Sequence, residues 1–311
     1  MLAPLISALE NQTLHPDRFE VVIVDDGSTD GTDTELRAIG AHTNLSLLAL
    51  RSEPNRGRSH GRNLAWRSGS APVVAFTDDD CLPEPQWLER GLAAVGREKA
   101  ILVGRTVPAV PFAESGPFSR TMNVDGVEHL ATCNIFYSRD DLEAADGFDE
   151  SFQIIAEDTD LAWRIRDITG RRFAYEPAAI VRHAVRPSRF LDALRESTRG
   201  YGIPLFVSRH PSARRTVLHR RYFWLPSHSK ALLALAGTAL LVFGIGVARP
   251  LIAVGGSALW LPWLRHRLRA APLPTRSMRR RPLYLPGAFV IDLAEVLATL
   301  RGSLRYRTLV L

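Results

Sequence analysis

The sequence predicts an α/β domain with a mostly parallel sheet, followed by a transmembrane hairpin and a helix that lies at the membrane interface. In residues 1–186, short apolar segments of strand length alternate with helical segments, as in right-handed βαβ units. Acidic and turn-forming residues follow several of these apolar segments, and a long stretch of low charge lies in the second half. We therefore divide the chain into four parts: the α/β domain at 1–186, a basic amphipathic connector at 187–224, the hairpin at 225–265, and a basic linker with the interfacial helix at 266–311.

Composition and charge support this division. Of the 311 residues, 46% are apolar and 23% are charged, which is sufficient for a folded core. Residues 1–186 contain 19 basic and 29 acidic residues, whereas residues 187–311 contain 20 basic and 4 acidic ones. We expect the first part to bind a cation and the second to contact anionic membrane lipids, and we expect no nucleic-acid partner. Cys81 and Cys133 are too few for a disulfide framework, and neither lies in a metal-binding Cys cluster.

Apolar periodicity places the elements of the first part. Met1–Gln12 has apolar residues at helical spacing, and the apolar run Phe19–Val24 has the length of a parallel strand covered on both faces. The later strand segments are Leu45–Leu50, Pro72–Phe76, Ala100–Val107, His129–Tyr137 and Ala178–His183. The later helical segments are Asp30–Ile39, Asn63–Ser68, Glu84–Val95 and Glu157–Ile168. Acidic loops follow the carboxyl ends of strands, which is the edge where open α/β sheets bind ligands.

An acidic run, Asp78-Asp79-Asp80, directly follows the strand at Pro72–Phe76. Three adjacent carboxylates repel one another, and a bound cation relieves this repulsion. The Asp-x-Asp spacing allows Asp78 and Asp80 to converge on one divalent ion, Mg²⁺ or Mn²⁺, that also binds a substrate phosphate. The alternative is a solvated turn whose acids cap the next helix, but a second acidic pair after an earlier strand favours the metal site.

That second pair is Asp25-Asp26, which is followed by Gly27-Ser28. Carboxylates accept hydrogen bonds from the NH groups of a base or the hydroxyls of a ribose, so the pair favours nucleotide recognition. A tight turn with a helix N-cap is the competing interpretation for Ser28 and Asp30. The chain has neither a Gly-Lys-Ser/Thr phosphate loop nor a Gly-x-Gly-x-x-Gly motif, which counts against a nicotinamide enzyme.

Basic residues lie between the two acidic runs. Arg56, Arg58 and Arg62 alternate with Gly57 and Gly61, and this pattern suits either a clamp on a diphosphate or a solvated basic loop. We favour a fixed position for Arg62, because it lies at the predicted start of a helix.

Three further residues are candidates for chemistry. Glu157 and Asp158 begin a predicted helix, where a carboxylate can accept a proton from a hydroxyl or simply interact with the helix dipole. His183 ends a strand and is a candidate metal ligand or a neutral hydrogen-bonding group.

The second half contains the predicted membrane segments. Ala231–Leu264 is 34 residues long and carries a single charge, Arg249, which precedes Pro250. Extending the segment back through Tyr222–Leu225 gives two spans that turn at Arg249-Pro250. The alternative is a pair of buried helices in a soluble domain. The basic residues that follow place this end on the cytoplasmic side; they are Arg265, Arg267, Arg269, Arg276, Arg279, Arg280 and Arg281.

Two other helices complete the second half. Ser188–Ser208 has the pattern of a basic amphipathic helix. Pro286–Leu304 is apolar but contains Asp292 and Glu295, which favours a helix lying in the membrane interface over a third span.

Taken together, these motifs resemble the inverting GT-A glycosyltransferases of family 2. The resemblance covers roughly residues 2–186 and rests on Val21–Thr32, Asn55-Arg56-Gly57 with Gly61-Arg62-Asn63, Thr77–Asp80, Gly147–Glu150 and Glu157–Arg164. It implies a Rossmann-like GT-A fold and a nucleotide-diphosphate sugar donor. By the resemblance, Asp25 and Asp26 would contact the nucleotide, and Asp78 and Asp80 would hold a divalent metal. From their positions in the sequence we add Ser28, Arg62, Asp78 and Asp79 as nucleotide contacts and His183 as a metal ligand. Asp158 would be the catalytic base, with Glu157 beside it. The C-terminal half resembles bacterial members that act at the cell membrane, from the cytoplasmic side, on cell-envelope glycans or lipids.

The sequence departs from the family pattern in two places. The family begins with a strand ending in Pro-x-Tyr/His-Asn that contacts the base, whereas this sequence begins at Met1 in the following helix. It also lacks the Gln-x-x-Arg-Trp element of processive synthases, since Arg220–Trp224 matches it only superficially, and this favours single sugar additions. Two alternatives remain: a sugar nucleotidyltransferase, whose Gly-rich basic loop we do not find after the first strand, and a non-catalytic membrane scaffold.

Overall fold

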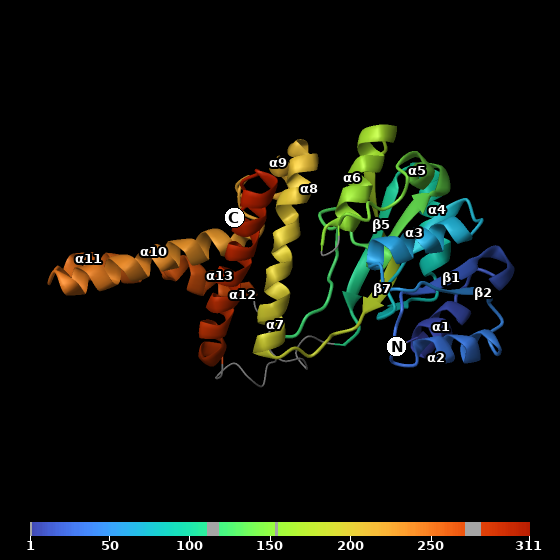
Figure 1. The fold of residues 1–311 in the computed structure, drawn as a ribbon, viewed down its shortest axis with the longest axis horizontal. Helices are drawn as coiled ribbons and strands as arrows, with labels where there is room; N and C mark the ends of the chain where they lie inside the picture. The colour runs from blue at the N-terminus through green and yellow to red at the C-terminus, as the bar shows by residue number, and fades with distance from the viewer. Residues whose placement is uncertain (1, 111–117, 153–154, 271–280) are drawn as a thin grey trace. The chain divides into compact units, whose positions relative to one another are not determined.

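A computed structural model describes residues 2–110, 118–152, 155–270 and 281–311 of the chain. The chain forms two compact units. The first consists of Met1–Val110 and Thr121–Val185, and the second of Pro111–Arg120 and Arg186–Leu311. The first unit contains the strands and the second is helical (Figure 1), so the predicted α/β class is confirmed for the first unit.

The strands of the first unit form two sheets. In the smaller sheet, β1 (Glu20–Asp25) pairs in parallel with β2 (Ser46–Arg51). The larger, five-stranded sheet has the order β3-β6-β5-β7-β4. Its strands are β3 (Val73–Phe76), β4 (Cys81–Pro83), β5 (Ile101–Pro108), β6 (Ile135–Ser138) and β7 (Phe173–His183).

The prediction of a mostly parallel sheet is wrong for the larger sheet. Only β5 and β7 are parallel there, whereas the pairs β3–β6, β5–β6 and β4–β7 are antiparallel. Parallel neighbours need a crossover connection, usually a helix. The described residues between β5 and β6, 109–110 and 118–134, form no α-helix, and β6 runs beside β5 in the opposite direction.

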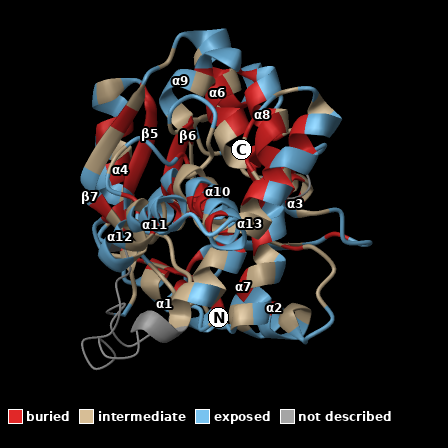
Figure 2. Ribbon diagram, turned by 90° about the vertical axis from the view of Figure 1, so that its left-hand side faces the viewer, coloured by how far each residue is buried: buried red, intermediate tan, exposed pale blue. Residues whose placement is uncertain are grey.

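Helices cover these sheets and close an apolar core. They are α1 (Leu2–Glu10), α2 (Thr32–Gly40), α3 (Arg58–Ser68), α4 (Trp87–Glu98), α5 (Arg139–Ala144) and α6 (Glu157–Thr169). The core includes the buried Trp87 of α4, whose ring lies 5.3 Å from that of Phe136 on β6. Figure 2 shows β5 and β6 coloured as buried. The elements around the acidic loops therefore rest on a rigid, packed base.

The predicted strand at His129–Tyr137 is realised only in part. Residues Thr132–Asn134 form a 3₁₀ turn, and the strand begins at Ile135. The cause is the buried side chain of Asn134, whose amide donates to the carbonyl oxygens of Arg105 and Ala179. It also accepts a hydrogen bond from Trp87 Nε1 at 2.8 Å. These tertiary hydrogen bonds replace the ladder hydrogen bonds that a longer strand would make.

The helical unit begins with a broken helix. Instead of the predicted continuous helix at Ser188–Ser208, the structure has α7 (Phe190–Ser197), a 3₁₀ turn at Thr198–Gly202 and α8 (Ile203–Arg209). Pro204 lies at the start of α8, because a proline has no N–H to donate to the preceding turn. The short elements Pro211–Ala213 and α9 (Arg214–Val217) follow.

The apolar stretch of this unit folds into α10 (Pro226–Gly246), α11 (Pro250–Ala258) and α12 (Leu261–Ala270). Among the described residues, α10 alone is long and apolar enough to cross a membrane, and only 22% of its most apolar 18 residues are buried. Gly237 of α10 and Gly256 of α11 lie in contact, and a Cβ at Gly237 would come within 2.5 Å of the Gly256 carbonyl oxygen. Small residues thus allow these two helices to pack closely.

The last helix, α13 (Arg281–Tyr306), includes the predicted interfacial segment. Its two acids make internal contacts. The buried Asp292 accepts a hydrogen bond from Trp263 Nε1 at 2.7 Å and pairs with Arg267. Glu295 lies 3.2 Å from the buried imidazole of His228. Both carboxylates therefore hold α13 against α10 and α12.

Candidate active site

Asp25 ends β1 and is buried. Its carboxylate accepts a hydrogen bond from the backbone N–H of Ser28 at 2.9 Å. It also forms an ion pair with Arg51, the residue opposite Asp25 on the neighbouring strand β2. Burial alone would raise the pKa of Asp25, but the hydrogen bonds from Ser28 and the charge of Arg51 lower it below its ordinary value. Asp25 is therefore an ionised group that shapes the loop around Ser28.

Asp26 joins the loops that follow β1 and β2. Its two carboxylate oxygens accept hydrogen bonds from the backbone N–H groups of Arg56 and Gly57, at 3.0 and 2.7 Å. The side-chain amide of Asn55 donates to the Asp26 carbonyl oxygen at 2.6 Å. The structure thus brings the first acidic pair and the Asn55-Arg56-Gly57 segment together.

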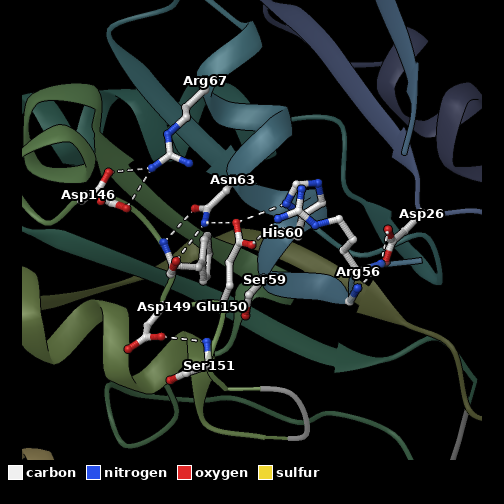
Figure 3. A network of polar contacts seen from close by, with 12 residues as sticks. Asp26, Arg56, Ser59, His60, Asn63, Arg67, Asp146, Asp149, Glu150 and Ser151 are labelled. Atoms are coloured by element: carbon white, nitrogen blue, oxygen red, sulfur yellow. Dashed lines mark hydrogen bonds and ion pairs between the residues drawn. The ribbon is translucent and has the colours of Figure 1, made fainter. Parts of the chain in front are cut away.

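A second network continues from that loop to the segment before α6, and Figure 3 shows it. Glu150 lies 3.3 Å from Arg56 Nη2 and 3.2 Å from His60 Nδ1, and its carboxylate accepts from the Asn63 amide at 3.2 Å. Burial would raise the pKa of Glu150, but hydrogen bonds from Asn63 and His60 lower it. The buried Asn63 also exchanges hydrogen bonds with the backbone of Phe148 in both directions, each at 2.8 Å.

Arg62 connects the acidic run Asp78–Asp80 to the start of α6. Its Nη1 donates to Glu157 Oε1 at 2.8 Å, and its Nη2 donates to Asp78 Oδ1 at 3.2 Å. Burial would lower the pKa of Arg62, but the charges of Asp78, Glu157 and Asp158 raise it above the ordinary value. The guanidinium thus neutralises carboxylates from two segments and is not a solvated loop cation.

Asp158 has the most perturbed carboxyl group of this site. Burial, followed by the negative charge of Glu157, raises its pKa to about 6. The residue before this pair, Ala156, has φ +75°, which is unfavourable for a side chain with a Cβ. Such backbone strain is concentrated at functional sites. A carboxylate with a pKa near neutrality is suited to accept and release a proton.

Asp80 and His183 lie together at the junction of β4 and β7. The register pairs Cys81 with His183, and the N–H of Ala184 donates to the Asp80 carbonyl oxygen at 2.8 Å. His183 Nδ1 lies 2.9 Å from the Ala184 carbonyl oxygen, which only accepts, so Nδ1 carries the proton. Nε2 lies 3.5 Å from Asp80 Oδ1. A carboxylate oxygen and an imidazole nitrogen this close can share a cation, whether a proton or a metal ion.

A thiol also lies within this group. The ligand atoms of Asp80, Cys81 and His183 all lie within 4.8 Å of one another. Contact with Cys133 and burial raise the pKa of the Cys81 thiol well above its usual range. A soft sulfur ligand also suits Mg²⁺ and Mn²⁺ less well than carboxylate oxygens do. Asp78 is not in this group and pairs with Arg62 instead, while Asp79 is exposed.

Sequence reasoning did not identify the bonding partners that support these residues. Glu150 and Asn63 were part of motifs, but nothing in their spacing indicated that they contact one another. Arg164 was also missed as a support: it pairs with the buried Asp160 at 2.7 Å and donates to the Gly147 carbonyl oxygen at 2.6 Å. A charged residue four positions after an acid on one helix was the available signal.

Comparison with known proteins finds similar glycosyltransferases. A haloarchaeal glycosyltransferase, AglE of Haloferax volcanii, is 36% identical over 103 residues, which is 33% of this chain and 33% of AglE. The glucosyl-dolichyl phosphate glucuronosyltransferase of the same organism is 27% identical over 193 residues, covering 55% of this chain and 60% of that protein. The chain thus spans less than two thirds of the length of either relative.

Among solved structures, the fold matches a mannosyltransferase from Pyrobaculum calidifontis in complex with GDP-Man and Mn²⁺. The TM-score is 0.59 at 20% identity, over 96% of this chain and 83% of that one. The model of glycosyl transferase family 2 matches residues 1–142, and that of glycosyl transferase family group 2 matches residues 73–264. The chain therefore belongs to glycosyltransferase family 2, an inverting family with the GT-A fold.

Proposed function

We propose that this protein transfers a sugar from a nucleotide-diphosphate sugar to an acceptor hydroxyl in a single displacement that inverts the anomeric carbon. The observation that best supports this function is the bridge through Arg62, which donates to Glu157 Oε1 at 2.8 Å and to Asp78 Oδ1 at 3.2 Å. It links the acidic run to the start of α6, where the pKa of Asp158 is raised. In this proposal Asp158 removes the proton of the acceptor hydroxyl. Glu157, held by Arg62, keeps the proton affinity of Asp158 high through its negative charge.

A divalent cation, Mg²⁺ or Mn²⁺, fits the chemistry of the side chains of Asp80 and His183. Asp80 Oδ1 and His183 Nε2 lie 3.5 Å apart, and Asp78 lies two residues before Asp80. When bound, the metal supplies Lewis-acid stabilisation of the departing diphosphate. The structural relative from Pyrobaculum calidifontis contains Mn²⁺ and GDP-Man, which supports the same cofactor and donor class for this chain.

The nucleotide is assigned to the loops after β1 and β2. Asp25 is ionised and fixes the Ser28 loop, and Asp26 fixes the loop at Arg56 and Gly57. We assign the contacts with base and ribose to these two loops, and we place the diphosphate near the exposed Asp79. Arg62 is already paired with two carboxylates, so its proposed contribution to donor binding is to keep Asp78 in place.

We further propose attachment to the cell membrane, with the first unit in the cytoplasm and a cell-envelope glycan or lipid as the acceptor. The long apolar helix α10 and its close contact with α11 support a membrane hairpin. Arg265 and Arg269 of α12 provide a basic flank.

The function is tested with the purified full-length chain, a panel of nucleotide sugars, and Mn²⁺. Asp158→Asn should reduce transfer at least about 100-fold, because general-base assistance is lost, while binding of the donor measured by calorimetry stays intact. Asp167→Asn, near the other end of α6, is the matched control and should retain activity. Full transfer by Asp158→Asn would exclude Asp158 as the base, and absence of any nucleotide-sugar binding would overturn the proposed function.

A further inference from the structure

The helix α13 (Figure 1) buries one side in the helical unit and exposes the other. Its inner side includes the buried Thr299 and Ser303, and Gly302 lies against the carbonyl oxygen of Tyr201. The two acids of the helix make their contacts inside the unit, Asp292 with Arg267 and Trp263, and Glu295 with His228. The outer side of α13 therefore carries no unpaired acid.

An apolar stripe runs along this outer side. Val290, Leu297 and Leu304 follow one another at intervals of seven residues, which is close to two helical turns. They are 44%, 64% and 76% exposed, and Leu300 beside them is 36% exposed. Single exposed apolar residues are normal, whereas a continuous apolar patch marks an interaction surface. The stripe therefore needs a partner that covers it.

Two arginines flank the stripe. Arg301 lies four positions after Leu297, and Arg305 lies four positions after Arg301, so both belong to one row of the helix surface. Both are exposed, and in the part of the chain that the structure describes neither guanidinium forms an ion pair with a carboxylate. The outer side of α13 thus joins an apolar row to a basic one.

The helical unit has no acid left to neutralise these arginines. Residues 187–311 contain four acidic residues, and each of them already contacts a basic partner. The four pairs are Asp192 with Arg195, Glu196 with Arg120, Asp292 with Arg267, and Glu295 with His228. Neutralisation of Arg301 and Arg305 must therefore come from outside the unit.

Two tyrosines accompany the arginines. The guanidinium of Arg301 lies 5.6 Å from the ring centre of Tyr201, and that of Arg305 lies 5.7 Å from the ring centre of Tyr306. The two tyrosine rings are 5.8 Å apart, and both residues are half-buried. Tyrosine and arginine both combine an apolar body with a polar tip, and tyrosine is enriched where a membrane meets water. This end of α13 has the composition of a surface at the level of lipid head groups.

The charge of the outer side decides between two possible occupants. If α13 helices of two copies of the chain paired through the stripe, Arg301 and Arg305 would meet further arginines and no acid on the opposing outer side, and like charges disfavour such an interface. An anionic bilayer instead covers the stripe with acyl chains and offers phosphates to the arginines. The lipid surface therefore satisfies both rows, whereas a second copy satisfies one.

We propose that the outer face of α13 lies on the anionic surface of a lipid bilayer. This face consists of Val290, Leu297, Leu300, Arg301, Leu304 and Arg305. The leucines enter the boundary of the acyl chains, and the arginines contact lipid phosphates. Because α13 packs against α10 near Ala231 and Ala234, the helix provides a second membrane contact beside the apolar one. The inference rests on the membrane attachment proposed above and is independent of the transfer reaction.

The first test separates α13 from α10. In full-length chains that carry Leu235→Arg, which weakens insertion of α10, binding is measured by flotation with vesicles of phosphatidylcholine, alone or mixed with phosphatidylglycerol. We expect binding to the mixed vesicles to be at least about tenfold tighter and to weaken with added salt, because exposed charges are screened. Replacing both arginines, Arg301→Gln with Arg305→Gln, should weaken binding to the mixed vesicles about tenfold or more.

The matched control is Arg18→Gln with Arg90→Gln in the same background, which removes two exposed arginines of the first unit. It changes the net charge equally and should bind as its parent does. Equal binding of the two double variants would overturn the role of Arg301 and Arg305, and equal binding to both kinds of vesicle would overturn the anionic partner.

The second test places a probe on the face in the otherwise unchanged chain. Leu297→Cys is labelled with a polarity-sensitive fluorophore, since the native Cys81 and Cys133 are 0% and 2% exposed. Its emission should shift to shorter wavelength on the mixed vesicles, whereas a probe at Asp17→Cys, on an exposed turn of the first unit, should not shift.

An unshifted Leu297 probe on vesicle-bound protein would overturn this inference and leave α10 as the anchor. A shift that appears without vesicles and grows with protein concentration would assign the face to a second copy and also overturn it. Failure of the unchanged chain to bind either kind of vesicle would overturn the membrane attachment as well, while sugar transfer remains a separate measurement.

Discussion

Arg62 Nη1 donates a hydrogen bond to Glu157 Oε1 at 2.8 Å, although 95 positions separate the two residues in the sequence. Glu157 is 2% exposed, so the guanidinium supplies the charge that makes an ionised carboxylate tolerable there. Because the positive charge of Arg62 lowers the pKa of Asp158 while the charge of Glu157 raises it, this pair tunes the proposed base.

The first prediction concerns that tuning. Arg62→Gln should raise the pKa of Asp158 above its value of about 6, so the acidic limb of the kcat/KM profile should move to higher pH. NMR titration of the Asp158 carboxyl provides a direct measurement of the same shift. Arg67→Gln, which removes an exposed cation from the same helix α3, should leave the limb in place. If the acidic limb does not move in Arg62→Gln, Arg62 does not influence the pKa of the catalytic base.

The second prediction concerns stability. The Asp158 carboxyl has a pKa of about 6 in the folded protein against an ordinary value of 3.8, so the folded state holds the proton more tightly than the unfolded chain. The ionised group therefore costs stability above pH 6, and this cost vanishes as the pH falls below about 4. Asp158→Asn should raise the free energy of unfolding by roughly 1–2 kcal/mol at pH 7.5 and leave it nearly unchanged at pH 4. Urea titrations at both pH values measure it; an equal effect at both would contradict the raised pKa.

The third prediction concerns the metal. His183→Gln should weaken Mn²⁺ binding by roughly tenfold or more, because the ring nitrogen Nε2, which lies 3.5 Å from Asp80 Oδ1, is lost. Calorimetric titration of Mn²⁺ into chelator-treated protein measures this affinity. His15→Gln, an exposed histidine outside the site, should bind Mn²⁺ as the wild type does. Wild-type affinity in His183→Gln would place the metal elsewhere.

The fourth prediction concerns the buried amide of Asn63. Asn63→Asp keeps the volume but replaces the donor to Phe148 O and Glu150 with a negative charge. We expect a loss of about 2–4 kcal/mol in the free energy of unfolding, measured by urea denaturation. Asn11→Asp, at an exposed position after α1, should change it little, and similar stability of the two variants would contradict the role of Asn63.

The fifth prediction concerns membrane attachment. Leu235 lies near the middle of α10 and is 46% exposed. Leu235→Arg should disfavour insertion by roughly 3 kcal/mol, the cost of an arginine at the centre of a span, and should release the protein from membranes in an alkaline carbonate wash. Leu309→Arg, at another exposed leucine outside α10, should stay in the membrane fraction. Equal retention of both variants would argue against α10 as the anchor.

The local sequence predicted most elements of the first unit but not how the strands pair. Alternating apolar and helical segments located β1, β2, β3 and β5 to within a few residues, because each is bounded by turn-forming residues. Strand direction depends on which distant segment supplies the neighbouring strand. The mostly parallel prediction failed for this reason at β6, which returns beside β5 in the antiparallel direction.

By itself, the sequence determined that acidic pairs follow buried strands and that a basic, apolar half follows an acidic one, since both features are properties of contiguous residues. Only the tertiary structure decided the partners of those acids. The β4–β7 register pairs Cys81 with His183 and thereby brings His183 beside Asp80, while the packing of α3 brings Arg62 to both Asp78 and Glu157. Hydrogen-bond partners far apart in the chain are set by strand register and helix packing. The acidic run at Asp78–Asp80 is accordingly divided: Asp78 pairs with the arginine, and Asp80 faces the histidine.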